Sequence, residues 1–127
     1  MKLLLDTHAV LWAVQSPEKL SKAARDLLAG DHDFLISVAS LWEIVIKTSI
    51  GKLRLGGPVE EAFPDIAEQL DASILPIELE HLYAVDRLPL HHRDPFDRLL
   101  IAQSIVEGVP ILTQDPQFGS YAAATIW

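Results

Sequence analysis

Four acidic residues stand where their carboxylates could act together in one site. Asp6 and Asp115 each follow a short apolar run, in LLLDTH and ILTQD. Glu43 lies one turn into a helical pattern in ISVASLWE, and Asp97 lies in the first turn of another, in RDPFDR. Because ligands of an open parallel sheet bind beyond the carboxyl ends of its strands, we expect all four carboxylates to converge on one pocket.

Carboxylates that are held close together suit one kind of chemistry. They repel one another, and their pKa values rise unless a cation neutralises them. A cluster of oxygen ligands without His or Cys suits a hard cation such as Mg²⁺ or Mn²⁺. Such an ion can turn a bound water into a nucleophile and can stabilise charge on a phosphate. The residues alone therefore predict metal-assisted hydrolysis of a phosphodiester bond.

Three of these acids also have a purely structural interpretation. Asp6 and Asp115 could simply cap the helices that follow them, and Pro116 stands behind Asp115 at a position typical of a helix start. Glu43 could pair with Lys47, because oppositely charged residues four apart stabilise a helix. The sequence leaves both interpretations open for each residue, and the shared location of the acids favours the functional one.

Asp94 and Asp97 flank the start of a predicted helix in RDPFDR. Asp94 precedes Pro95, which suits the first helical position, so Asp94 fits an N-cap and Asp97 falls at the third helical position. We therefore expect a structural role for Asp94, with a place in the site as the alternative. Asp97 is expected to be the functional carboxylate of the two.

The elements that must position these acids alternate along the chain. Apolar runs predict strands at Lys2–Leu5, Phe34–Ser37, Ser73–Ile77, Pro110–Thr113 and Ala124–Trp127. Helical patterns lie at Thr7–Val14, Ser21–Ala29, Ala39–Ile50, Val59–Leu70, Glu80–Arg87 and Pro95–Val106. This alternation indicates an α/β fold with a parallel sheet covered on both faces. No repeat or linker divides the chain, so we expect a single domain over residues 1–127.

Composition limits the class of protein further. The chain has 127 residues and no cysteine, which excludes disulfides and thiolate metal sites. No apolar run approaches the length of a membrane span or of a signal-peptide core, so we expect a cytoplasmic protein. A net charge of −8 argues against broad electrostatic binding of nucleic acid. A polyanionic partner would need a local basic patch or a metal ion to offset the repulsion.

Four motifs occur in an order that resembles a known family. They are LLLDTHAVLW, ISVASLWEIVIKTSIGKL, HHRDPFDRLLIAQ and VPILTQDPQF, and they span most of the chain. The chain resembles a PIN-domain ribonuclease, and more closely a VapC-type toxin of a toxin–antitoxin pair. The resemblance implies a three-layer α/β/α sandwich with a parallel sheet of about four or five strands. It also implies a Mg²⁺- or Mn²⁺-dependent endoribonuclease that acts on transfer RNA or other structured RNA.

The resemblance also assigns roles to individual residues. The family's four acids fall on Asp6, Glu43, Asp97 and Asp115. Asp6 and Asp97 would be the direct metal ligands, and Glu43 and Asp115 would complete the cluster through the metal or a bound water. Further contacts to the substrate or the site are expected from Thr7, Lys47, Arg98 and Thr113. The alternatives are backbone hydrogen bonding for the threonines and an ion pair or solvation for Arg98.

VapC-type proteins are homodimers that an antitoxin protein keeps inactive, so the resemblance implies both partners. The C-terminal segment of the antitoxin is expected across the catalytic groove, packed on the apolar helices around Leu41–Ile50 and Val59–Leu70. The acidic net charge of this chain would suit a basic inhibitory peptide. Trp12 and Trp42 are expected in the core or at an interface rather than as platforms for base stacking.

Other functions remain as alternatives. One is a PIN-like nuclease of ribosomal RNA maturation or DNA flaps, which the short chain disfavours. Another is a phosphoacceptor receiver domain, a signalling module with an acidic Mg²⁺ pocket. A receiver needs an Asp at the end of its third strand and a Lys at the end of its fifth, whereas here the third run meets Pro76 and no Lys follows Lys52. An inactive PIN domain is disfavoured by the intact set of acids.

Overall fold

The computed structural model describes residues 1–91 and 93–127, and across them five parallel strands form one sheet. The strands lie in the order β3-β2-β1-β4-β5. Their bounds are β1 (Lys2–Leu5), β2 (Asp33–Ser37), β3 (Ala72–Leu75), β4 (Ile111–Leu112) and β5 (Thr125–Ile126). Each neighbouring pair is parallel, as the alternation of strands and helices predicted.

The helices agree with the sequence pattern to within about two residues. They are α1 (Thr7–Gln15), α2 (Lys22–Ala29), α3 (Val38–Ser49), α4 (Val59–Leu70), α5 (Leu79–Arg87) and α6 (Pro95–Glu107). Local signals explain their ends: Ser21 Oγ accepts a hydrogen bond from the Ala24 amide, and Gly108 closes α6 with a left-handed φ of 67°. The short 3₁₀ helix η1 (Pro17–Lys19) was not predicted, because a single turn carries no periodicity. A second one, η2 (Pro116–Ser120), begins at Pro116, where the capping interpretation of Asp115 expected a helix.

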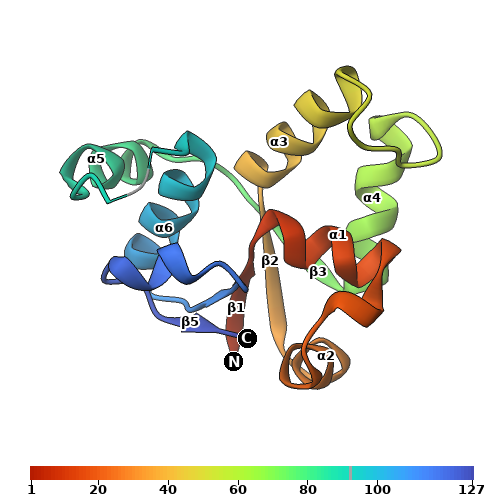
Figure 1. Ribbon diagram of the computed structural model, residues 1–127, viewed down its shortest axis with the longest axis horizontal. Coiled ribbons are helices and arrows are strands. Elements are labelled where there is room, and N and C mark those ends of the chain that lie inside the picture. The colour runs from red at the N-terminus through yellow and green to blue at the C-terminus, as the bar shows by residue number, and fades with distance from the viewer. Residues whose placement is uncertain (92) are drawn as a thin grey trace.

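The sheet lies between two helical layers (Figure 1). Alternate residues of a strand point to opposite faces, so Leu3 and Leu5 join one hydrophobic cluster while Leu4 joins the other. The first cluster includes residues of α1, α2 and α4, and the second is built largely on α6. The predicted three-layer α/β arrangement is therefore confirmed. No helix in the described ranges is both long and apolar enough to cross a membrane.

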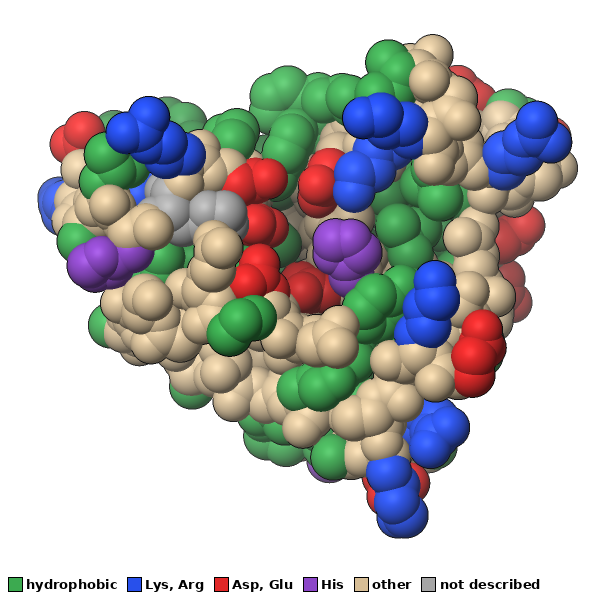
Figure 2. Space-filling view, viewed as in Figure 1, with side chains coloured by type: hydrophobic (Ala, Val, Ile, Leu, Met, Phe, Trp, Pro, Cys, Tyr) green, Lys and Arg blue, Asp and Glu red, His purple; other side chains and the backbone are tan. Residues whose placement is uncertain are grey.

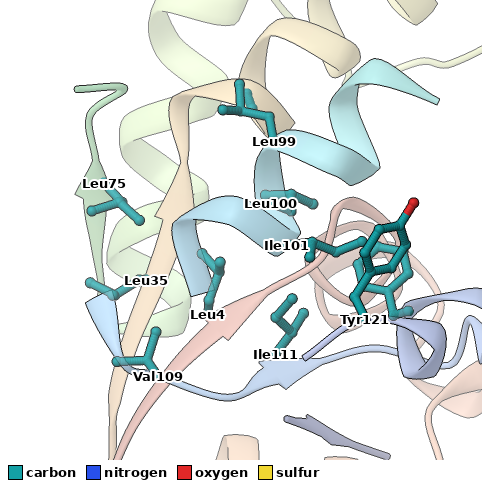
Figure 3. Packing of buried hydrophobic residues seen from close by; sticks show 11 residues of the cluster. Leu4, Leu35, Leu75, Leu99, Leu100, Ile101, Val109, Ile111 and Tyr121 are labelled. Carbon is teal, nitrogen blue, oxygen red and sulfur yellow. The ribbon is translucent and has the colours of Figure 1, made fainter. Parts of the chain in front are cut away.

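Helix α6 lies deep in the molecule and gives the site a fixed support. All residues from Leu99 to Ser104 are buried, and Leu99, Leu100 and Ile101 pack against Leu4 and Ile111 of the sheet (Figure 3). A helix that is buried on most of its surface cannot shift without disturbing the core. The carboxylates at its N-terminus are therefore held in place.

The third strand differs from its prediction. We expected Ser73–Ile77, but β3 covers Ala72–Leu75 and stops before Pro76. Proline has no amide hydrogen to donate to a neighbouring strand, which explains the earlier end. β3 is also the edge of the sheet, so Ser73 and Ile74 are exposed instead of being covered on both faces.

The order of the strands indicates where a ligand is expected to bind. The connections run outward to one side of β1 through β2 and β3, and then return to its other side with β4. In open α/β sheets, ligands bind at the carboxyl ends of the two strands where this order reverses. Asp6 directly follows β1, and Asp115 lies just beyond β4. The order also differs from the 2-1-3-4-5 order of receiver domains.

Candidate active site

A cavity of about 290 Å³ lies at this carboxyl edge of the sheet. The side chains around it are Asp6, Thr7, His8, Glu43, Lys47, Asp94, Asp97, Asp115 and Phe118. On the same face of the molecule, acidic side chains gather around a hollow, with a histidine beside them (Figure 2). All four predicted acids therefore line one cavity, and Asp94 joins them.

Asp6 is both a helix cap and a wall of the cavity. Its side chain is 6% exposed, and Oδ1 accepts a 2.6 Å hydrogen bond from the Ala9 amide at the start of α1. Oδ2 accepts a 2.5 Å hydrogen bond from the Thr113 hydroxyl. Burial raises the pKa of Asp6, the charge of Asp115 acts in the same direction, and the two hydrogen bonds oppose them. The structural and functional interpretations of Asp6 are thus compatible.

Thr113 connects Asp6 to the segment that carries Asp115. The Thr113 hydroxyl donates to Asp6 and accepts a 3.1 Å hydrogen bond from the Asp115 amide. Asp115 in turn caps η2, with Oδ1 accepting from the Gln117 amide at 2.9 Å. The hydroxyl of Thr113 therefore positions the Asp6 carboxylate and the backbone of Asp115.

Glu43 and Lys47 form the predicted i, i+4 ion pair, and both also line the cavity. The Lys47 Nζ lies 3.4 Å from the Glu43 Oε2, with side chains 30% and 15% exposed respectively. Lys47 is the only lysine or arginine among the residues described around this cavity. The pair thus places one positive charge beside a group of acids.

Asp94 caps α6 as the sequence predicted. Its Oδ1 accepts hydrogen bonds from the Phe96 amide at 2.9 Å and the Asp97 amide at 3.0 Å. Pro95 follows at the first helical position, where its missing amide hydrogen costs nothing. Because Asp94 also lines the cavity, its alternative place in the site is supported by position.

Thr7 joins two of the elements that build the cavity. Its hydroxyl donates a 3.0 Å hydrogen bond to the Ser40 hydroxyl, and both side chains are buried. This bond links the first turn of α1 to the first turn of α3. The expected alternative for Thr7 was a bond to the backbone, whereas the observed partner is a side chain from another helix.

Arg98 lies away from the cavity. Its guanidinium donates to the carbonyl oxygens of Val85 at 3.1 Å and Pro89 at 3.0 Å, and lies 3.4 Å from the Tyr121 hydroxyl. These contacts join the end of α5 to α6. Arg98 is not among the residues around the cavity, and its expected contact with the substrate stays a prediction.

Two lining residues were missed from the sequence. His8 is exposed in the first turn of α1, two positions after Asp6, and this closeness to an acid was the signal that could have identified it. Phe118 is 1% exposed and closes the cavity from η2. Nothing local in the sequence marks Phe118, because its place depends on how η2 packs.

The donor set fits a hard, hydrated cation. Within the described ranges, no three His, Asp or Glu side chains converge closely enough to hold one metal ion directly. Mg²⁺ commonly keeps several waters and uses one or two protein carboxylates, so a cavity lined by separated carboxylates suits it. A cation would also offset the burial cost of the Asp6 charge.

Comparisons with known proteins identify the family. The PIN domain family model matches residues 3–124, so the chain belongs to the PIN-domain family. It is similar to Ribonuclease VapC22 of Mycobacterium tuberculosis (strain ATCC 25618 / H37Rv), with 27% identity over 130 residues and 98% of each chain covered. The resemblance to VapC-type PIN proteins that the motifs predicted is thereby confirmed.

A solved structure shares the fold. The crystal structure of VapBC2 from Rickettsia felis, bound to a DNA fragment from their promoter, contains a chain that matches with a TM-score of 0.73. The match covers 99% of this chain and 98% of the other, at 17% sequence identity. At that identity the likeness confirms the α/β fold alone.

Proposed function

We propose that this protein is a metal-dependent endoribonuclease that hydrolyses phosphodiester bonds in RNA, and that it is the toxin of a toxin–antitoxin pair. The observation that carries the proposal is the cavity of five carboxylates and one lysine at the point where the strand order reverses. Its occurrence in a PIN-domain chain similar to a protein named as a VapC ribonuclease supports the substrate class.

The proposed metal is Mg²⁺ or Mn²⁺, held by Asp6 and Asp97, with Glu43 and Asp115 acting directly or through water. When bound, such an ion supplies a nucleophilic water and stabilises negative charge on the phosphate. The protein's part is to hold the carboxylates ionised and in place. Thr113 and the Ala9 amide do this for Asp6, because hydrogen bonds to a carboxylate favour its charged form.

Lys47 is proposed to bind an RNA phosphate. The chain carries a net charge of −8, so the substrate meets an overall repulsion that a local cation must offset. Lys47 lies on the cavity wall, and its pairing with Glu43 restricts where its ammonium group can go. Thr7, anchored on Ser40, and Thr113 act mainly by positioning.

Protein partners are proposed from the exposed apolar surface. Along α3 and its C-cap residue, Trp42, Ile46 and Ile50 recur every four residues and are 54%, 38% and 59% exposed. Such a stripe suits the homodimer contact or the antitoxin segment, since exposed apolar patches mark protein interfaces. Helix α4 remains the other proposed surface for the antitoxin segment, and its Phe63, Ile66 and Leu70 pack inward on the core.

A cleavage assay tests the proposal. Purified protein is incubated with transfer RNA, ribosomal RNA and flap DNA, with Mg²⁺, with Mn²⁺ and with a chelator. We expect RNA cuts that need the metal and that disappear in Asp6→Asn and Asp97→Asn. Intact cleavage in both variants would overturn the carboxylate mechanism, and preference for flap DNA would favour the alternative nuclease.

The toxin role needs a test in cells. Expression of the wild type is induced beside Asp6→Asn, and RNA ends are sequenced. Growth arrest with new RNA ends only in the wild type, relieved by the neighbouring antitoxin gene, is the expected result. Cleavage in vitro without growth arrest would support the nuclease activity and overturn the toxin role.

A further inference from the structure

A second hollow opens beside the carboxylate cavity. It has a volume of about 430 Å³, and its lining residues are Asp6, His8, Trp12, Gln114, Asp115 and Pro116. Asp6, His8 and Asp115 line both hollows, so the two share a wall. The remaining three residues have no part in the function proposed above. Pockets of about 300–1,000 Å³ are typical of small-ligand sites, so there is room for one flat ring system.

Trp12 forms a fixed aromatic surface in this hollow. Its ring packs against the hydrophobic cluster behind α1, and the ring of Trp127 meets it edge-on at 5.8 Å and 64°. The His8 ring also lies beside it, 5.5 Å away and tilted by 44°. An aromatic ring that already packs against neighbouring side chains loses little freedom when a ligand stacks on its open face. Trp12 was expected in the core or at an interface rather than as a platform for stacking, and it is only partly buried.

The chemistry of the hollow favours a neutral, flat and polar-edged group. A nucleobase is uncharged, so the two carboxylates on the shared wall would not repel it. Gln114 is exposed at the rim, and its amide offers both donors and an acceptor to the edge of a base. Stacking of one base on an aromatic side chain strengthens binding by about 5- to 150-fold.

We propose that this hollow binds one nucleobase of the RNA, that of the nucleotide next to the cleaved bond, stacked on Trp12 with Gln114 at its edge. The proposal rests on the proposed function, because the adjoining phosphate must lie in the carboxylate cavity. The shared wall makes the two positions neighbours along one chain. Trp12 and Gln114 are then specificity-determining residues for RNA cleavage.

Binding of a base can be tested without cleavage. The indole Nε1–H signals of Trp12 and Trp42 are followed by NMR, with assignments from Trp12→Phe and Trp42→Phe. The probes are adenosine and uridine 5′-monophosphates, ribose 5-phosphate, and N-acetyl-leucinamide as a model of a peptide side chain. We expect the nucleotides alone to shift the Trp12 signal. A shift with ribose 5-phosphate of the same size, or a shift with N-acetyl-leucinamide only, would overturn the proposal.

Cleavage of modified RNA gives the second test. An abasic residue is placed at each position around the cut site of one oligonucleotide, and kcat/KM is measured. For the wild type we expect a loss of about 5- to 150-fold at one flanking position. The Trp12→Leu variant should cut the intact and the abasic RNA with the same, lower kcat/KM. The control variant Trp42→Leu should keep the wild-type difference in kcat/KM between the two RNAs. Gln114→Ala should change the preference among the four bases at that position.

The two tests separate this proposal from the function on which it rests. If RNA is cut and an abasic residue is tolerated at every position, the base site is wrong and the nuclease stands. If no RNA is cut with either metal, the proposed function fails, and the NMR titration still decides whether the hollow binds a base. Trp12→Phe is a second variant in case Trp12→Leu does not fold. It keeps an aromatic ring, so it should retain a reduced preference for the intact RNA.

Discussion

The Thr113 hydroxyl donates a 2.5 Å hydrogen bond to the Asp6 carboxylate across 107 residues of sequence, and both side chains are buried. Asp6 is the residue between β1 and α1, and Thr113 directly follows β4. The bond therefore ties together the two strand ends between which the order of the sheet reverses. It also opposes the rise in the pKa of Asp6 that burial causes.

Thr113→Val should destabilise the protein and weaken its site. The substitution leaves Asp6 Oδ2 and the Asp115 amide without the hydroxyl they share. A buried polar group that loses its partner costs about 1–3 kcal/mol, measured here as the free energy of unfolding in urea. Thr113→Ser keeps the hydroxyl and is the control. Equal stability of the valine variant and the wild type would show that the bond contributes nothing.

Asp6→Asn should abolish cleavage without loss of stability at neutral pH. Burial raises the pKa of Asp6 above its ordinary value of 3.8. Between 3.8 and the folded pKa, the folded state binds the proton more tightly, so stability falls as pH rises through that window. Asparagine does not titrate, so it removes this dependence of stability on pH. Its side-chain oxygen can still accept a hydrogen bond from the Ala9 amide. Urea midpoints between about pH 3 and about pH 8 measure it; identical slopes in both proteins would contradict the prediction.

Metal binding should stabilise the wild type more than the variants. A ligand that binds only the folded state at 100 times its Kd adds about 2.7 kcal/mol. We expect Mg²⁺ or Mn²⁺ to raise Tm in the wild type, with a smaller rise in Asp6→Asn and Asp97→Asn. Thermal melts with each ion and with a chelator measure the effect. The same rise in all three proteins would place the ion elsewhere.

Lys47→Gln should weaken RNA binding and reduce its dependence on salt. If Lys47 contacts one phosphate, the slope of log affinity against log salt should fall by about one. Binding is measured in the Asp6→Asn background so that the RNA stays intact. Lys22 forms a similar i, i+4 pair with Asp26 but is not among the residues around the cavity, so Lys22→Gln is the matched control. Equal slopes for the two variants would remove Lys47 from the interface.

Asp94 can be tested as a cap separately from its charge. Asp94→Ala loses the bonds to the Phe96 and Asp97 amides and should cost about 0.5–2 kcal/mol. Asp94→Asn keeps a good cap and removes only the charge, so we expect wild-type stability and cleavage within a few-fold of wild type. An asparagine variant as inactive as Asp97→Asn would instead make Asp94 a functional carboxylate.

Local signals explain why much of the fold could be predicted. Ser21 and Asp94 cap the helices expected of them, and the proline after Asp94 starts α6 where the pattern indicated. The acids could be assigned to the site because they follow strands or open helices, and all parallel strands end at one edge. The same reasoning could not anticipate the contacts of Arg98, because the carbonyl oxygens that bind it come from α5 and from the segment that follows it.

The sequence by itself determined the alternation of strands and helices, the caps, and which carboxylates reach the carboxyl edge of the sheet. These depend on periodicity and on neighbours within a few residues. Only the tertiary structure decided the strand order, the bond from Thr113 to Asp6, and the hollow where His8, Trp12 and Gln114 meet. Those contacts join segments more than 100 residues apart, and packing of the whole core sets them.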